Sequence, residues 1–190
     1  MFVRSGVLFA ESGSPVTQSP SPNFDQRPVG AVVDALVIHH ISLPPGRFGG
    51  DHILQLFSNR LDCRAHPDFA PLQGLRVSAH VLIRRDGEVI QLVNLDARAW
   101  HAGVSSLAGR ADCNDFSIGI ELEGDGDAPF EDAQYASLIA GVRAIQTAYP
   151  AITPQRMVGH SDIAPGRKTD PGPQFDWVRF LTAVTPSANG

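Results

Sequence analysis

The residues best suited to chemistry are two histidines and an aspartate from distant parts of the chain. His39 lies at the end of the apolar run ALVIHH, His160 ends the short run RMVGH, and Asp170 follows in the next loop. Two imidazoles and a carboxylate suit zinc, and three protein ligands leave a fourth tetrahedral position open. This set predicts hydrolysis of an amide or an ester. Because a single histidine is more often structural, the spacing alone leaves that alternative open.

The loop that carries Asp170 concentrates polar groups where regular structure is disfavoured. In GHSDIAPGRKTDPGPQFDW, the prolines and glycines oppose a long helix or strand. Lys168 in this loop is the only lysine of the chain. A lysine presents a compact charge that suits one developing anion. A polar loop on a rigid scaffold is often a site, although a solvated connection rich in turn formers is the simpler interpretation.

Glu121 is the candidate for moving a proton. Its segment, FSIGIELEG, has the alternation of a strand. The apolar positions of this alternation are Phe116, Ile118, Ile120 and Leu122. Glu121 points to the opposite side, which is either solvent or the site. Amide hydrolysis needs a proton-transfer group and a cation for the oxyanion, and we assign these roles to Glu121 and Lys168.

The elements that must position these residues alternate between strands and helices. We expect strands over 35–40, 116–124 and 156–160, a hairpin over 79–93 that turns at Asp86-Gly87, a short helix within 49–57, and helices over 132–149 and 177–184. This order predicts an α/β fold with a mixed central β-sheet flanked by helices.

Length and composition indicate one domain. The chain has 190 residues, 43% hydrophobic and 18% charged, which is enough to bury one substantial core. Residues 12–28 are rich in serine and proline. We therefore expect a surface segment over 1–30, the domain over 31–185 and a frayed tail over 186–190.

The charge balance favours a small-molecule substrate over a polyanionic partner. The formal net charge is −5, with 20 acidic and 15 basic residues, which disfavours nucleic acid and anionic membranes. No stretch approaches a membrane span, and the first residues are a poor signal peptide. Cys63 and Cys113 are expected to be free thiols. We expect a cytoplasmic monomer.

Several long motifs resemble one known family. The segments VIHHISLPPGRFGG, LRVSAHVLIRRDGEVIQ, RAWHAGVS, CNDFSIGIELEG and GHSDIAPGRKTDPGPQFDW resemble the AmpD-type amidases. These belong to the zinc amidase family, which includes peptidoglycan recognition proteins. The resemblance covers nearly the whole chain and implies the zinc amidase (peptidoglycan recognition protein-like) fold. It also implies that His39, His160 and Asp170 hold one zinc per chain. It also implies that Glu121 and Lys168 are catalytic.

The resemblance further implies a substrate and a set of substrate-binding residues. The bond cut is the amide between (anhydro-)N-acetylmuramic acid and L-alanine of muropeptides, in cell-wall recycling. Arg76 and Arg167 resemble family positions near the substrate, where we expect them to meet peptide carboxylates. We expect Trp100 to stack on a sugar. A surface ion pair and a core aromatic are the ordinary alternatives. We interpret His66 and His80 as structural.

Two positions depart from the family pattern and leave the substrate detail open. His40, which we include among the substrate-binding residues, stands where AmpD-type amidases usually carry asparagine, and Asp112 stands where an arginine is expected. Two other functions stay open. One is a lytic amidase that acts on intact peptidoglycan, and the other is a muropeptide-binding module without activity.

Overall fold

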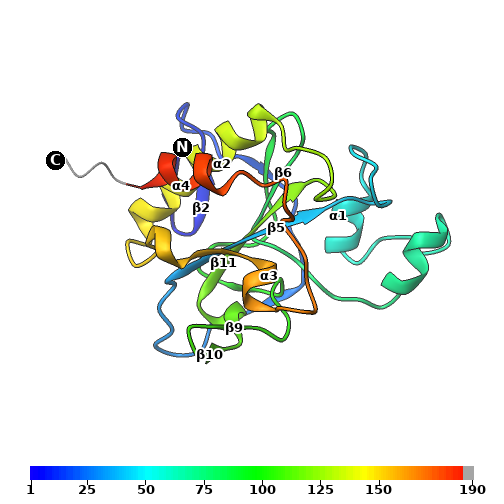
Figure 1. Cartoon of the computed structure of the whole chain (residues 1–190), viewed down its shortest axis with the longest axis horizontal. Coiled ribbons are helices and arrows are strands. Elements are labelled where there is room, and N and C mark those ends of the chain that lie inside the picture. The colour runs from blue at the N-terminus through cyan, green and yellow to red at the C-terminus, as the bar shows by residue number, and fades with distance from the viewer. Residues whose placement is uncertain (186–190) are drawn as a thin grey trace.

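The computed structural model describes residues 1–185 and is built around a six-stranded sheet with the order β12-β5-β11-β6-β7-β3. Its strands are β3 (Thr17–Gln18), β5 (Ala35–Ile41), β6 (Val81–Ile83), β7 (Val89–Gln91), β11 (Ser117–Glu123) and β12 (Met157–Gly159). Strands β12, β5, β11 and β6 run parallel, whereas β7 is antiparallel to β6. The predicted mixed sheet is therefore confirmed, and β5 and β11 lie at its centre (Figure 1).

Helices and short strand pairs surround this sheet. The helices are α1 (His52–Phe57), α2 (Asp132–Ala148), α3 (His160–Ile163) and α4 (Trp177–Val184), with 3-10 turns η1 (Pro67–Leu72), η2 (Cys113–Asp115) and η3 (Pro154–Arg156). The strand pairs are β1 (Phe2–Arg4) with β2 (Val7–Phe9), β4 (Phe24–Asp25) with β8 (Arg98–Ala99), and β9 (Ser106–Leu107) with β10 (Arg110–Ala111). None of the helices in residues 1–185 combines the length and apolar character needed to cross a bilayer.

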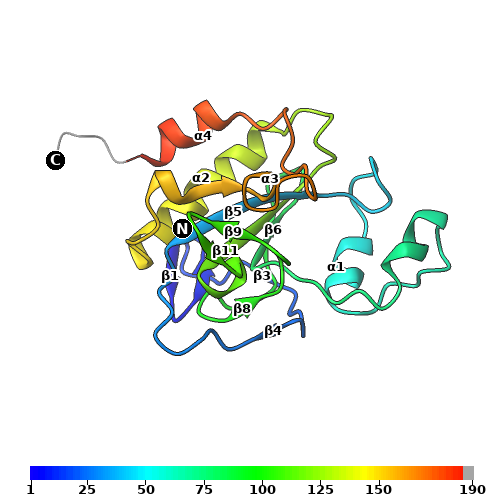
Figure 2. The same cartoon turned by 60° about the horizontal axis from the view of Figure 1, so that its bottom comes forward.

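Helices α2 and α4 cover one face of the sheet. Along β5, Leu36 and Ile38 point into a core shared with Leu138 of α2 and Phe180 of α4, as the alternation of a strand requires. Figure 2 shows these two helices on the same side of the sheet, with β4 and β8 on the other side. The amphipathic pattern of α2 therefore predicted its packing correctly.

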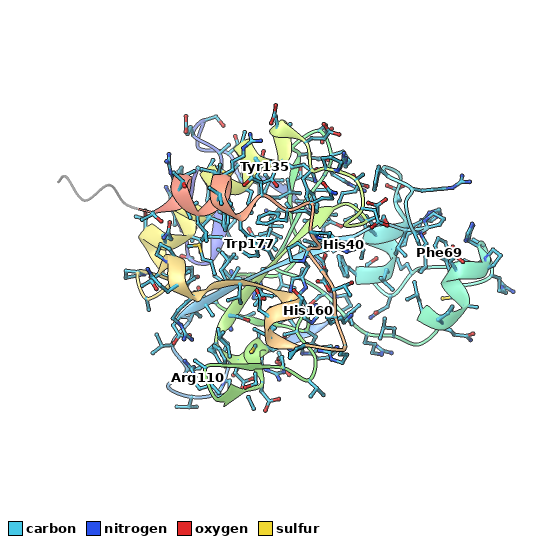
Figure 3. All side chains as sticks on the ribbon, in the orientation of Figure 1. His40, Phe69, Arg110, Tyr135, His160 and Trp177 are labelled. Atoms are coloured by element: carbon cyan, nitrogen blue, oxygen red, sulfur yellow. The ribbon has the colours of Figure 1, made fainter. Side chains whose placement is uncertain are left out.

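The opposite face is covered by two smaller clusters. Val37 of β5 packs with Ala102, Phe116 and Ile163. A second cluster joins α1 and η1 to the sheet and has Phe69 at its centre, in the lobe at one end of the molecule (Figure 3). Phe116 does not share the face of Ile118 as its alternation predicted. The turn η2 precedes β11, so regular alternation begins only at Ser117.

The first 30 residues are more closely integrated than a surface segment. The β1–β2 hairpin contacts α2 and buries Leu8 to 1% exposure, and β3 pairs with β7. The Arg27 guanidinium, mostly buried, donates to the backbone carbonyls of Asn114, Asp115, Leu95 and Ser117. The apolar run of residues 1–10 is broken by Ser5 and Gly6, and β3 lies among serines and prolines, so neither gives a clear local signal. The expected tail, 186–190, lies outside the described residues.

Candidate active site

Two neighbouring parallel strands bring the two histidines to one edge of the sheet. His39 lies near the carboxyl end of β5, and His160 directly follows the adjacent β12 at the start of α3 (Figure 3). The His39 and His160 Nδ1 atoms are 2.9 Å apart. Asp170 Oδ2 lies 2.9 Å from His39 Nδ1 and 3.1 Å from His160 Nδ1. The three side chains that we singled out as ligands therefore converge on one point.

The loop between His160 and Asp170 returns closely on its own beginning. The Ser161 N–H donates to the Asp170 carbonyl at 2.9 Å. A Cβ atom at Gly159 would lie only 2.7 Å from Pro171 Cδ, so glycine is needed for this approach. We expected a loop without a long helix or strand, and the only helix before Asp170 in this loop is the single turn His160–Ile163. It ends before Pro165 and Gly166, which oppose its continuation.

The hydrogen bonds behind the two imidazoles decide which nitrogen faces the cluster. His160 Nε2 lies 3.0 Å from the Ala102 carbonyl, which only accepts, so Nε2 carries the proton and Nδ1 is a free donor atom. His39 Nε2 lies 3.0 Å from His101 Nδ1. Burial lowers the pKa of His39 to about 4, which keeps this imidazole neutral. Neutral imidazoles whose outer nitrogens are engaged are the form that binds a metal.

Asp170 completes this donor set as a carboxylate. Burial opposes its ionisation, yet the contacts of its carboxylate with the His160 and His39 imidazoles hold the pKa of Asp170 below its ordinary value. Two neutral nitrogens and one charged oxygen within 4.8 Å of one another fit a zinc-type cation.

Glu121 lies beside this cluster in a dry position. It pairs with His39 in the register of β11 and β5, so the two side chains leave the same face of the sheet. Glu121 is 9% exposed, and its buried Oε2 has no hydrogen-bond partner within the described part of the chain. Burial and the charge of Asp170 raise the pKa of Glu121 well above its ordinary value, against the opposing charge of Lys168. Such a carboxyl group is suited to proton transfer.

Lys168 belongs to the same neighbourhood but is exposed to solvent. Its backbone N–H donates to the Ala164 carbonyl at 3.1 Å, which fixes the start of its side chain. Its positive charge lowers the pKa of both His39 and Glu121. The ammonium group is therefore within electrostatic reach of the cluster, as a group that meets a developing anion must be.

Two of the four expected substrate-binding residues, Arg167 and His40, hydrogen-bond to backbone carbonyls near the cluster. Arg167 is exposed, but one guanidinium nitrogen donates to the carbonyls of Ala102 and Val104 at 2.7 Å each. His40 follows His39 and leaves the other face of β5. Its Nδ1 donates to the Gly124 carbonyl at 3.2 Å. Both side chains therefore already form hydrogen bonds to backbone carbonyls of neighbouring segments.

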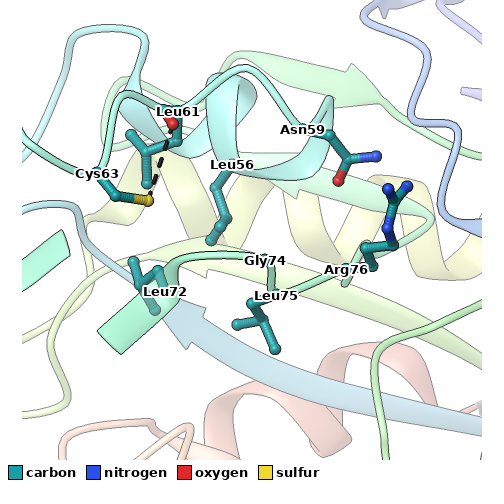
Figure 4. A pocket seen from close by; sticks show the side chains of 8 residues that line it. All are labelled: Leu56, Asn59, Leu61, Cys63, Leu72, Gly74, Leu75 and Arg76. Atoms are coloured by element: carbon teal, nitrogen blue, oxygen red, sulfur yellow. Dashed lines mark hydrogen bonds between the residues drawn. The ribbon is translucent and has the colours of Figure 1, made fainter. Parts of the chain in front are cut away.

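Of the other two expected residues, Arg76 lies on the segment after η1, and Trp100 directly precedes His101, a neighbour of His39. Arg76 is exposed and lines a pocket of about 160 Å³ between α1 and η1, together with Asn59 and Cys63 (Figure 4). Trp100 is half-buried, and its backbone N–H bonds to Ser78 Oγ. Cys63 and Cys113 are free thiols, as predicted.

The sequence reasoning missed His101, which contacts His39 directly. Gly119 could have indicated such a contact, because an isolated glycine in a strand often marks a position where another group closely approaches the backbone. A Cβ atom at Gly119 would lie 2.5 Å from the His101 ring. His80 and His66, interpreted as structural, bond to backbone N–H groups of Gly119 and Asp68.

The fold and the site together define a class of hydrolase. A mixed sheet delivers two imidazoles and a carboxylate to one edge, beside a buried carboxyl group. Residues 29–173 match the family described as N-acetylmuramoyl-L-alanine amidase. The chain belongs to this family and is an amidase.

Similar proteins agree with this assignment. The chain is 59% identical over 170 residues to the 1,6-anhydro-N-acetylmuramyl-L-alanine amidase AmpD of Citrobacter freundii, covering 90% of each chain. A crystal structure of a selenomethionine AmpD derivative matches with a TM-score of 0.91 and 55% identity over 97% of this chain and 100% of that one. The Escherichia coli amidase AmiD in complex with its anhydro-N-acetylmuramyl peptide substrate matches with a TM-score of 0.62 and 29% identity, over 97% and 68%.

Proposed function

We propose that this amidase is zinc-dependent and cuts the amide between 1,6-anhydro-N-acetylmuramic acid and L-alanine of muropeptides in cell-wall recycling. The observation that carries the zinc proposal is the convergence of His39 Nδ1, His160 Nδ1 and Asp170 Oδ2 within 4.8 Å of one another. The substrate proposal is supported by the relatives, which are named for this bond and match over most of their length.

The three converging side chains hold one zinc per chain. When bound, zinc supplies the Lewis acidity that activates a water molecule and polarises the amide carbonyl. Glu121 takes a proton from the attacking water and delivers it to the leaving amine of L-alanine, a role that suits a carboxyl group whose pKa is raised. The Lys168 ammonium stabilises the negative charge that develops on the carbonyl oxygen.

Substrate recognition is assigned to four residues around this centre. Arg76 and Arg167 are exposed and offer guanidinium groups to the carboxylates of the stem peptide. Trp100 offers its half-buried ring to a sugar face, and His40 stands beside the ligand His39 on β5. The proposed substrate is thus a small muropeptide whose stem peptide carries negative charge.

The proposed compartment is the cytoplasm, where the enzyme acts as a monomer on soluble wall fragments. Two free thiols, one of them buried, suit a reducing compartment. The negative formal net charge of −5 suits neither nucleic acid nor an anionic membrane surface as a partner.

A direct competition between two substrates tests the proposed function. Purified enzyme is given anhydro-muropeptide and intact sacculi at equal stem-peptide concentration, and released peptide is measured by mass spectrometry. We expect release mainly from the anhydro-muropeptide. Comparable rates on sacculi would instead identify a lytic amidase, and binding without release would identify a non-catalytic module. The variant His40→Asn is run in parallel, and an unchanged substrate ratio would remove His40 from the substrate-binding set.

A further inference from the structure

Both metal-facing imidazoles depend on the same two residues, His101 and Ala102. His101 Nδ1 lies 3.0 Å from His39 Nε2, and the Ala102 carbonyl lies 3.0 Å from His160 Nε2. His101 is 8% exposed and Ala102 is fully buried. One short segment therefore contacts the outer nitrogen of each imidazole, on the side away from Asp170.

The hydrogen bonds behind His39 form a chain that ends at the Cys113 carbonyl, and this end fixes which group donates in each bond. Ser117 Oγ donates its only proton to the Cys113 carbonyl at 2.5 Å, because a carbonyl can only accept. Ser117 Oγ therefore accepts from His101 Nε2, which lies 3.2 Å away. With its proton on Nε2, a neutral His101 has an accepting Nδ1.

The same reasoning continues to the metal-facing atom. His101 is buried, and its two ring nitrogens contact only the His39 imidazole and the Ser117 hydroxyl, so no carboxylate pairs with a charged form and the ring is neutral. His101 Nδ1 accepts the Nε2 proton of His39, so His39 Nδ1 is left unprotonated toward His160 and Asp170. The carbonyl of Cys113 thus sets the tautomer of His39 through Ser117 and His101.

The segment itself is held in place by one buried amide. Asn114 Oδ1 accepts from the backbone N–H groups of His101 and Ala102, at 3.1 and 2.8 Å. Asn114 is 7% exposed. Gly119 leaves room for the His101 ring, and Arg167 donates to the Ala102 carbonyl from the other side. These contacts restrict the movement of His101 and Ala102 relative to the two imidazoles.

We infer that His101 is a positioning residue of the zinc site, which together with the Ala102 carbonyl presets both imidazoles with Nδ1 free for the metal. The inference rests on the zinc part of the proposed function. Partners of this kind orient a ligand and typically change metal affinity about 10- to 100-fold when removed. Ser117 and Asn114 act one step further from the metal and should contribute less.

The affinity of the zinc-loaded enzyme for its metal tests this inference. A chelator is titrated into wild type, His101→Leu, His101→Asn and Ser117→Ala. We expect zinc binding to weaken about 10- to 100-fold in His101→Leu, and less in His101→Asn, whose amide oxygen can still accept from His39. The matched control is His80→Asn, since His80 is buried like His101 and lies beside it but bonds to Gly119 and Ala97. Its zinc affinity should equal that of wild type.

A second readout needs no variant and separates a positioning role from a general structural one. Imidazole nitrogen spectra of the zinc-loaded wild type should show His101 protonated at Nε2 and unprotonated at Nδ1. A proton on His101 Nδ1 would overturn the inference, and so would a folded His101→Leu enzyme with wild-type zinc affinity. Failure of the wild type itself to bind zinc would overturn the proposed cofactor, whereas the protonation of His101 would still be read independently.

Discussion

At the scale of single residues, Glu121 lies beside the three proposed zinc ligands but is not one of them. Replacing it by glutamine keeps its volume and removes its proton exchange. We expect Glu121→Gln to retain zinc and fold and to lose about a hundredfold or more in rate, the usual contribution of a general acid and base. Zinc content and turnover of anhydro-muropeptide are measured on the same preparation. Near-normal turnover would exclude Glu121 from proton transfer.

Lys168 is assigned to charge stabilisation, and its exposure makes it a clean target for substitution. Removing its ammonium in Lys168→Ala should leave the folded state and the bound zinc unchanged. The rate should fall on the order of a hundredfold, as when one oxyanion partner is lost. Turnover is compared with that of Lys168→Arg, which keeps the charge but changes its geometry. An alanine variant as active as wild type would contradict the assigned role.

His80 predicts how stability responds to acid. Burial, reinforced by the charge of Arg27, lowers the pKa of His80 to about 3. In the unfolded chain it takes up a proton near its ordinary pKa of about 6.5. The unfolded state therefore binds more protons below about pH 6.5, and the free energy of unfolding decreases as the pH falls toward about 3, by up to about 1.4 kcal/mol per pH unit for this group.

The variant His80→Asn isolates this contribution, because its amide can still accept from the Gly119 N–H. Between about pH 7 and about pH 5, we expect wild type to lose up to about 2 kcal/mol more than the variant. Urea unfolding is measured with excess chelator, so that metal binding does not add its own pH dependence. Parallel pH profiles for the two proteins would show that His80 does not titrate as described.

At the scale of elements, the junction of β12 with the Asp170 loop is the most sensitive point. A Cβ atom at Gly159 would lie 2.7 Å from Pro171 Cδ, so Gly159→Ala must displace the residue next to Asp170. We expect a folded protein whose zinc affinity is reduced about tenfold or more. The control is Gly141→Ala in α2, where the nearest atom lies 3.9 Å from the new Cβ. It should gain about 0.5–1 kcal/mol of stability with zinc affinity unchanged, and equal zinc affinities of the two variants would refute the steric account.

The elements with clear periodicity were predictable, and those fixed by long-range contacts were not. The sequence indicated β5, β11 and α2 because hydrophobic alternation and helical spacing are local signals. His101 contacts His39, and Arg27 donates hydrogen bonds to backbone carbonyls, in both cases across a long stretch of chain. No local sequence pattern indicates such contacts. Strand β3, of two residues, was likewise too short to be noticed among serines and prolines.

At the scale of the whole molecule, the site exists only when three distant segments fold together. The types of His39, His160 and Asp170 suggested a metal, but only the adjacent parallel strands and the returning loop bring their donor atoms together. The spacing of these three residues is a weak signal, and the resemblance of the long motifs to AmpD-type amidases indicated that they bind the same metal. Binding a metal across these segments should stabilise the fold as a whole.

The central claim is that these three side chains hold one zinc, and elemental analysis tests it most directly. Wild type and Asp170→Ala are purified without added metal, and zinc is measured per chain. We predict one zinc per wild-type chain and the loss of most of it in Asp170→Ala, because removing one of three protein ligands leaves a weak site. Full zinc occupancy in Asp170→Ala, or a folded wild type without zinc, would contradict the account.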